Sequence, residues 1–328
     1  MNPKVSVIIP TYNRVKYISR AIDSVLNQTY DNIEVIVVDD NNENSSVRDE
    51  MTKVMSTYNN SVIYIKHKKN MNGACARNTG IKHASGDYIT FLDDDDYYFK
   101  TRIEKLVNKI EKEKCDAIYS AALIVKNSKI YSLKNAIMSG NLQLEVLKQQ
   151  SFFATGSNLF FTAKCLNELK GFDESFFRHQ DLELMVRFFR NYNICALDEI
   201  LVVKNVDDRS NELGLDKSIK YRFYFLDRYK EDISKYNINI QKDIYRENIV
   251  RLILLILKCN DKKKYCELFK VLKQHNIRLS VKDRMKIFLM KINVFSILEK
   301  IVIKLNLFKK NNISPDILNY VNLIENKK

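Results

Sequence analysis

The chain has 328 residues, of which 45% are hydrophobic, and a formal net charge of +14 at pH 7. This length and apolar content allow one large domain plus a smaller one and indicate a folded protein. The N-terminus has no secretory segment, and no uncharged apolar run reaches ~18 residues, so export and a membrane span are not expected.

The positive charge is unevenly distributed. Residues 1–210 hold 28 Lys or Arg against 27 Asp or Glu, whereas residues 211–328 hold 26 against 13. The basic character therefore belongs to the C-terminal third, which could face a membrane surface or nucleic acid, or could be a solvated helical surface.

The six cysteines are widely spaced, without a Cys-x-x-Cys pair or histidines at ligand spacing. The sequence therefore predicts neither a zinc site nor a disulfide framework. This cysteine usage favours a reducing, cytoplasmic location.

The first part of the chain alternates apolar strands with helices. Residues 5–9 form a β-branched run that Pro10 ends, and apolar positions recur at helical spacing over residues 17–26. The strand at 35–38 ends in Asp39 and Asp40. Further helices are expected at 47–58 and 74–84, and a further strand at 62–65. Unbroken apolar strands in β-α-β order predict an α/β fold, with a parallel sheet covered by helices on both faces.

A run of four acids, Asp93 to Asp96, follows the short apolar strand that starts at Tyr88. Adjacent carboxylates repel one another, and hard oxygen ligands suit Mg²⁺ or Mn²⁺. In open α/β sheets, ligands bind beyond the carboxyl ends of strands, so the tips at Pro10, Asp40 and Asp93 are expected to share a cleft. The alternative is a solvated acidic turn before the next helix.

The pattern then becomes mixed. A helix is expected at 102–113, strands at 117–125 and 159–161, and a short helix at 163–169, while residues 126–155 are weakly patterned. A further helix opens at His179, where Asp181 lies in the first turn and could simply stabilise the helix dipole. After about residue 210 the β pattern stops, and helices are expected at 217–235, 241–258, 261–275, 280–291 and 294–308.

Seven stretches together resemble glycosyltransferase family 2, the inverting nucleotide-sugar enzymes with the GT-A fold. They are VSVIIPTYNR (5–14), AIDSVLNQTY (21–30), EVIVVDDNNEN (34–44), NMNGACARNTGI (70–81), GDYITFLDDDD (86–96), GFDE (171–174) and HQDLELMVR (179–187). The resemblance implies a GT-A nucleotide-binding domain at 1–212, with a mostly parallel mixed sheet flanked by helices. A basic α-helical domain would follow at 213–328.

The resemblance also implies roles for single residues. Those expected to bind the nucleotide-sugar donor are Pro10, Thr11, Tyr12, Arg14, Asp40, Arg77, Asp93 and Asp94. Asp40 would accept from the base, and Arg77 would lie near the donor phosphates or hold the acidic tip. Asp95, with Asp93, would bind a Mn²⁺ or Mg²⁺ ion. Because the run has four acids, the ligand could also be the carboxylate one position away. Asp181 would be the catalytic base, with His179 and Glu183 next in line.

The implied reaction is one inverting displacement, in which an acceptor hydroxyl attacks the anomeric carbon. Processive members carry a Gln-x-x-Arg-Trp motif, and this chain has no tryptophan, so it looks like an enzyme that adds one sugar at a time. A UDP-sugar donor and a hexosyl or N-acetylhexosaminyl transfer are expected, in polysaccharide biosynthesis such as capsule formation. The acceptor would be a glycan or a lipid-linked oligosaccharide.

The basic C-terminal helices could contact an anionic membrane peripherally, because Ile287 to Phe308 mixes large apolar residues with lysines. Packing against the catalytic domain is the alternative. Nucleic-acid binding is not expected, because the cations are interleaved with core-like Ile and Leu. The rival functions are a metal-dependent nucleotidyltransferase and a non-catalytic nucleotide-sugar-binding protein.

Overall fold

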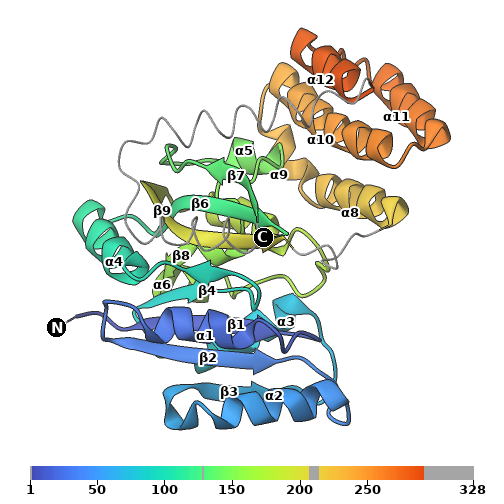
Figure 1. Cartoon of the computed structure of the whole chain (residues 1–328). Coiled ribbons are helices and arrows are strands. Elements are labelled where there is room, and N and C mark those ends of the chain that lie inside the picture. The colour runs from blue at the N-terminus through green and yellow to red at the C-terminus, as the bar shows by residue number, and fades with distance from the viewer. Residues whose placement is uncertain (1, 128, 207–213, 292–328) are drawn as a thin grey trace. The chain divides into compact units, whose positions relative to one another are not determined.

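The computed structural model describes residues 2–127, 129–206 and 214–291 and divides the chain into two compact units (Figure 1). Of the described residues, 2–142 and 151–206 belong to the first unit. Residues 143–150 and 214–291 belong to the second, so a short segment from the middle of the chain groups with the C-terminal helices. The sequence analysis expected the second domain to begin at residue 213 and did not assign residues 143–150 to it. That division into domains stays a proposal.

The first unit is built on a nine-stranded mixed sheet, which confirms the predicted α/β fold. Its main strand order is β3-β2-β1-β4-β8-β6-β9-β5, with β7 paired to β6. The strands are β1 (Val5–Thr11), β2 (Ile33–Asp39), β3 (Ile63–Lys66), β4 (Tyr88–Phe91), β5 (Tyr97–Tyr98), β6 (Ala117–Lys126), β7 (Lys129–Lys134), β8 (Phe160–Thr162) and β9 (Ile194–Val206). β1 to β4 run parallel, and β8 pairs antiparallel with both β4 and β6.

Helices cover both faces of the parallel part, as expected for strands that are apolar on both sides. The helices of this unit are α1 (Ile18–Leu26), α2 (Ser46–Ser56), α3 (Gly73–His83), α4 (Arg102–Glu113), α6 (Ala163–Glu168) and α7 (Gln180–Phe188). Val5, Val7 and Ile9 of β1 share a core with α1, α2 and α4. The opposite face carries Ile8, which meets α3 so closely that a Cβ on Gly80 would lie 2.3 Å from its Cγ2.

The sequence analysis left residues 190–209 unassigned, and most of them form β9. This strand runs parallel to β6 and antiparallel to β5. The β-branched run from Ile200 to Val203 is the signal that could have predicted it. β9 matters for the site because its end reaches the acidic run after β4.

The expectation of no disulfide is wrong, because Cys115 and Cys195 are bonded, with Cα atoms 6.1 Å apart. Eighty residues separate them in the chain, so their spacing carries no signal. They meet because β6 and β9 pair in register at Ala117 and Ile194. Cysteine usage therefore gives no support to a reducing location. Glu113 lies beside the pair, but bonded sulfurs offer no thiolate to a metal.

The second unit is helical. It contains α5 (Gln143–Leu147), α8 (Leu215–Arg228), α9 (Lys230–Ser234), α10 (Ile238–Lys258), α11 (Lys262–Gln274) and α12 (Val281–Lys291). A separate apolar core, centred on Ile253 and Ile256 of α10, joins α10 to α12. Asn248 ties α5 to α10 by donating to the Leu147 carbonyl at 3.0 Å. The helix expected at 294–308 lies outside the described residues.

No helix among the described residues is long and apolar enough to cross a membrane.

Candidate active site

The four acids after β4 have different surroundings, so they are not equivalent ligands. Asp94 is buried, accepts a hydrogen bond from Thr11 Oγ1 at 2.7 Å and lies 3.4 Å from Arg14 Nη1. Asp95 forms an ion pair with Arg14. Thr11 lies at the end of β1, so the tip of β1 and the acidic run after β4, which the sequence predicted to be neighbours, do meet here.

Asp96 is the most completely engaged of the four. Its Oδ2 accepts from Ser157 Oγ at 2.6 Å and from Thr155 Oγ1 at 3.1 Å. Its Oδ1 accepts from the backbone N–H of Asn205, in β9, at 3.0 Å. Asp96 is only 1% exposed, so it fastens the acidic turn to neighbouring segments.

Asp93 is the accessible member, with 34% of its side chain exposed. Arg77 Nη2 donates to Asp93 Oδ1 at 2.5 Å, and Arg77 Nη1 donates to Gln180 Oε1 at 2.9 Å. One guanidinium thus links α3, the strand tip and the start of α7. A Cβ at Gly73 would lie 3.0 Å from Arg77 Nη1 and 3.2 Å from Gln180 Oε1, so a larger residue there would press on this contact.

Burial and mutual repulsion raise the pKa values of three of these acids. Burial is the main cause for Asp94, whose pKa rises to about 7, and the charge of Asp95 adds to it. Burial and the charge of Asp93 raise the pKa of Asp95, and the pKa of Asp96 is raised well above its usual value for the same reasons. A nearby cation would favour the ionised forms.

The residues present fit a divalent cation of the Mg²⁺ or Mn²⁺ kind. Asp94, Asp95 and Asp96 are buried, and Asp93 is the most exposed of the four. Among the described residues, Asp93 and Asp95 each keep one carboxylate oxygen that no other side chain contacts. Magnesium typically takes one or two protein carboxylates and completes its shell with water and phosphate oxygens. A run of four carboxylates, of which two keep an uncontacted oxygen, matches that demand.

Asp181 lies in the first turn of α7 and lines a cavity of about 180 Å³ together with Arg77, Asp93 and Lys204. The hydrogen bond described for its carboxylate comes from the N–H of Leu182 to Oδ1 at 3.0 Å. Burial raises the pKa of Asp181, while the charges of Lys204 and Arg77 act in the opposite direction. The Asp181 carboxylate therefore shares its cavity with two positively charged side chains, Arg77 and Lys204.

The two neighbours of Asp181 that could replace it differ. Glu183 is 1% exposed and forms a paired contact with Arg187, with Nη2 to Oε2 at 2.8 Å, so its charge is already neutralised within the helix. His179 lines the cavity and has φ = 59° at the N-cap of α7. Of these two, only His179 borders the same space as Asp181.

Lys204 is the site residue that sequence reasoning missed. It lies near the end of β9 and lines the cavity, and its charge acts on both Asp181 and Asp96. Its Nζ donates to the Ala154 carbonyl at 3.2 Å. Nothing in the local sequence marks this lysine, since its position depends on how β9 pairs with β6 and β5.

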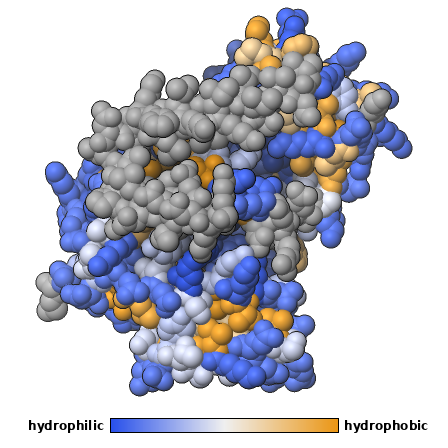
Figure 2. Space-filling model, viewed as in Figure 1, coloured by the Kyte–Doolittle hydropathy of each residue, from blue (hydrophilic) through white to orange (hydrophobic). Residues whose placement is uncertain are grey.

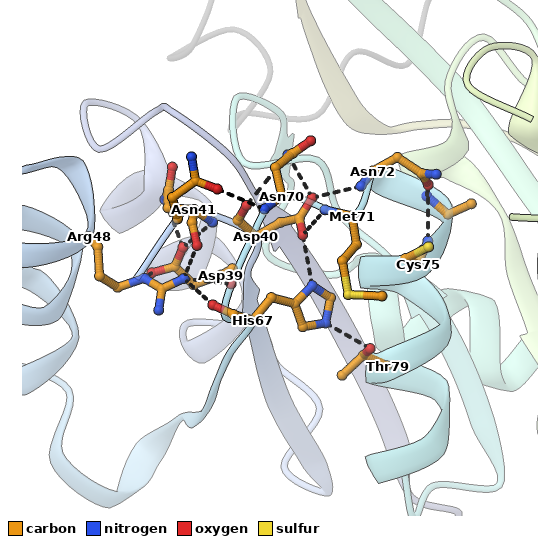
Figure 3. Close-up of polar contacts among 12 residues, drawn as sticks. Asp39, Asp40, Asn41, Arg48, His67, Asn70, Met71, Asn72, Cys75 and Thr79 are labelled. Atoms are coloured by element: carbon orange, nitrogen blue, oxygen red, sulfur yellow. Dashed lines mark hydrogen bonds and ion pairs between the residues drawn. The ribbon is translucent and has the colours of Figure 1, made fainter. Parts of the chain in front are cut away.

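Asp40 is enclosed by donors from its own neighbourhood (Figure 3). Its Oδ1 contacts His67 Nδ1 at 2.7 Å and accepts from the N–H of Met71 at 2.8 Å. Its Oδ2 accepts from Asn70 Nδ2 at 2.9 Å and from the N–H of Asn72 at 3.0 Å. A carboxylate offers about four lone-pair positions, so these contacts occupy it. Asp40 thereby anchors the segment before α3.

The remaining expected donor-binding residues lie at the end of β1 and on the loop after it, and they do not line the cavity that holds Asp181. Tyr12 is 49% exposed, and Thr11 contacts Asp94. The backbone N–H of Asp40 donates to the Thr11 carbonyl at 2.9 Å, which joins this loop to the end of β2. Thr11, between Pro10 and Tyr12 in the chain, therefore contacts the acidic run, whereas the Asp40 carboxylate points into its own cluster.

Comparisons with known proteins agree with one another. The family model described as glycosyl transferase family 2 matches residues 6–169. An uncharacterized glycosyltransferase of Rickettsia bellii is 34% identical over 209 residues, which is 62% of this chain but only 30% of that protein. The amylovoran biosynthesis glycosyltransferase AmsB of Erwinia amylovora is 28% identical, over 76% of this chain and 83% of that protein.

Solved structures share the fold. S. aureus TarS 1-349 in complex with UDP-GlcNAc has a TM-score of 0.63 at 18% identity, with 90% of each chain covered. The mannosyltransferase PcManGT from Pyrobaculum calidifontis, in complex with GDP-Man and Mn²⁺, has a TM-score of 0.56 at 16% identity. That alignment covers 95% of this chain and 89% of PcManGT.

Proposed function

The chain belongs to glycosyltransferase family 2, and on that premise we propose that it transfers one sugar from a UDP-sugar to an acceptor hydroxyl, with inversion at the anomeric carbon. The observation that carries the proposal is the cavity in which Arg77, Asp93, Asp181 and Lys204 face one another. In this cavity the Asp181 carboxylate lies near two positively charged side chains and near Asp93. This supports the proposal, because an inverting transfer to a hydroxyl is assisted by a group that removes a proton and by positive charge near the leaving group.

The proposed division of labour follows from charge. Asp181 accepts the proton of the acceptor hydroxyl as that oxygen attacks the anomeric carbon. Arg77 and Lys204 offset the negative charge that builds on the departing nucleoside diphosphate. Fixed cations are most effective when they need not move during the reaction, and Arg77 is already held by Asp93 and Gln180.

Asp93 and Asp95 would hold a divalent cation, Mn²⁺ or Mg²⁺, which neutralises phosphate charge when bound. The raised pKa values of Asp94 and Asp95 support this, because their ionised forms need a compensating positive charge. The Mn²⁺ in the PcManGT complex is a parallel among proteins of the same fold. Arg14, which pairs with Asp95, would shift its contact when the cation binds.

The nucleotide would lie along the loop after β1. Tyr12 is exposed enough to stack on a base, and Thr11, next to Pro10, contacts the acidic run. Asp40 would contribute mainly by holding the segment before α3 in place. A direct hydrogen bond from Asp40 to the base would displace one of its present donors.

The acceptor would be a glycan or a lipid-linked oligosaccharide in cell-surface polysaccharide synthesis. The name of AmsB connects that relative with the biosynthesis of amylovoran, which supports a role in the synthesis of a larger product. The transferred sugar would be a hexose or an N-acetylhexosamine, and the basic second unit would keep the enzyme at the cytoplasmic face of a membrane.

The test is a screen of nucleotide sugars with Mn²⁺ for slow hydrolysis in the absence of acceptor. We expect release of nucleoside diphosphate from one sugar class, with Asp181→Asn as the control. Release of pyrophosphate instead would indicate a nucleotidyltransferase. Binding of nucleotide sugar without turnover, even with a mixture of glycan acceptors, would indicate a non-catalytic binding protein.

A further inference from the structure

The second unit contains a groove of about 490 Å³ between α11 and α12. Leu272 and Ile287, which belong to the core of this unit, contribute to its floor, and Phe269 and Phe288 to its walls. Four cations, Lys273, Arg278, Arg284 and Lys291, also line it, and all four are exposed. The groove thus combines an apolar interior with a positively charged rim.

The outer face of α12 continues this surface. Val281, Met285 and Phe288 are 83%, 56% and 59% exposed, and their spacing puts them along one side of the helix. Hydrophobic side chains are visible among hydrophilic ones over α10 to α12 (Figure 2). A stripe of three large apolar residues beside an apolar groove is more than the scattered hydrophobics of an ordinary surface.

The negative charge of α12 is turned inward. Asp283 is its one acid and is 2% exposed. Its Oδ2 accepts from Ser280 Oγ at 2.6 Å and lies 3.2 Å from Arg246 Nε. Because Asp283 is buried, the side chains that α12 exposes are apolar or positively charged.

We propose that α12 and the groove beside it form a docking face for a bilayer that contains anionic phospholipid. The apolar stripe would enter the headgroup boundary, while Lys273, Arg278, Arg284 and Lys291 contact phosphates. No salt bridge engages these four cations within the described part of the chain. A second copy of the chain is the other possible occupant of this face. A twofold interface would bring the positive rims of the two copies together, and their repulsion favours the anionic lipid surface instead.

This inference deepens the proposed function, since it assigns membrane contact to named residues of the second unit. It concerns residues outside the first unit, which carries the acidic run and Asp181. Vesicle binding and nucleotide-sugar turnover can therefore fail independently. A protein that docks but does not turn over would contradict only the proposed reaction.

The experiment is cosedimentation of the full chain with vesicles of phosphatidylcholine alone or with 30% phosphatidylglycerol. We expect binding only to the anionic vesicles, weakening as salt rises above ~0.15 M, where screening acts over about 8 Å. The double variant Met285→Ser/Phe288→Ser should lose most binding. Lys273→Gln/Arg284→Gln should weaken it by roughly 30-fold, about fivefold for each charge.

Matched controls come from the same unit. Ile238 is 61% exposed at the start of α10, so Ile238→Ser removes a comparable apolar side chain outside the groove. Lys258 is exposed at the end of α10 and does not line the groove, so Lys258→Gln removes a comparable charge. Both controls should bind like the wild-type protein, and thermal melting should show that every variant is folded.

Three outcomes would overturn the proposal. Equal binding of the groove variants and the controls would place the contact elsewhere. Concentration-dependent dimers that Phe288→Ser abolishes, without vesicle binding, would make this face a contact between copies. A wild-type protein that stays off anionic vesicles, while Phe288→Ser lowers its melting temperature, would show that the chain itself covers the face.

Discussion

Arg77 Nη2 donates to Asp93 Oδ1 at 2.5 Å, and this pair joins the α3 helix to the tip of β4 at the most exposed carboxylate of the acidic run. The other nitrogen of the same guanidinium binds Gln180, one residue before Asp181. A cation is thus fixed between the expected metal ligand and the expected base. The predictions below follow from this arrangement and from the contacts around it.

Replacing Asp95 by alanine should abolish metal-dependent binding of nucleoside diphosphate. The change removes one of the two carboxylates that retain an open oxygen, and it relieves repulsion with Asp93, so the fold should persist. Calorimetry with UDP, with and without Mn²⁺, measures the effect. Asp31→Ala, at an exposed loop position, is the control. Unchanged Mn²⁺-dependent affinity in folded Asp95→Ala would remove Asp95 from the site.

Asp181→Asn should reduce turnover by roughly 10²-fold or more without changing donor affinity, because an amide keeps the size of the side chain but accepts no proton. A residue that only stabilises the start of α7 would instead cost at most ~1 kcal/mol of stability and leave turnover near normal. Thermal melting, donor binding and nucleoside diphosphate release separate the two. Normal turnover in a folded, donor-bound variant would leave His179 as the next candidate.

Lys204→Met should move the acidic limb of the pH profile of kcat/KM to higher pH. Asp181 must be ionised to act, and its pKa is already raised by burial while the charge of Lys204 lowers it. Removing that charge raises the pKa further, so a higher pH is needed to ionise the base. Lys204→Arg keeps the charge and should keep the limb near its original position. An identical profile in all three proteins would show that Lys204 does not act on Asp181.

Asp40→Asn should lower the free energy of unfolding by roughly 1–3 kcal/mol, because an amide oxygen cannot satisfy the donors from His67, Asn70, Met71 and Asn72, and a buried donor is left unpaired. Urea denaturation measures this, with Asp31→Asn as the exposed control. If stability were unchanged while donor affinity fell, Asp40 would contact the nucleotide base directly and would not act as an anchor.

The six cysteines should become accessible to an alkylating reagent in three stages: in the native protein, after denaturation and after reduction. In the native protein only Cys259 and Cys266 are exposed, so these two should react. Denaturation without reductant should add the buried Cys75 and Cys165, and reductant should then add Cys115 and Cys195. Mass spectrometry of the peptides identifies the sites. Six labelled cysteines in the denatured, unreduced protein would mean that the 115–195 bond does not form.

The sequence by itself determined the parts of this protein that depend on neighbours along the chain. The apolar runs of β1 and β2, the helical spacing of α1 and the acids after β4 were all readable, because strand and helix periodicity are local properties. Their order was enough to predict a parallel sheet with helices on both faces, whereas the mixed character of the sheet was implied only by the motif resemblance. The motif resemblance added the roles proposed for Arg77, Asp95 and Asp181.

Only the tertiary structure decided which of these side chains share a space. Lys204 enters the cavity, and Cys115 meets Cys195, because β9 pairs with β6 across a long sequence separation that leaves no local pattern. Asp40 and Asp93 both follow strands in the sequence, yet one is enclosed by four donors and the other faces the cavity. Whether a carboxylate is available to a ligand depends on the donors that folding brings to it, and those come from distant residues.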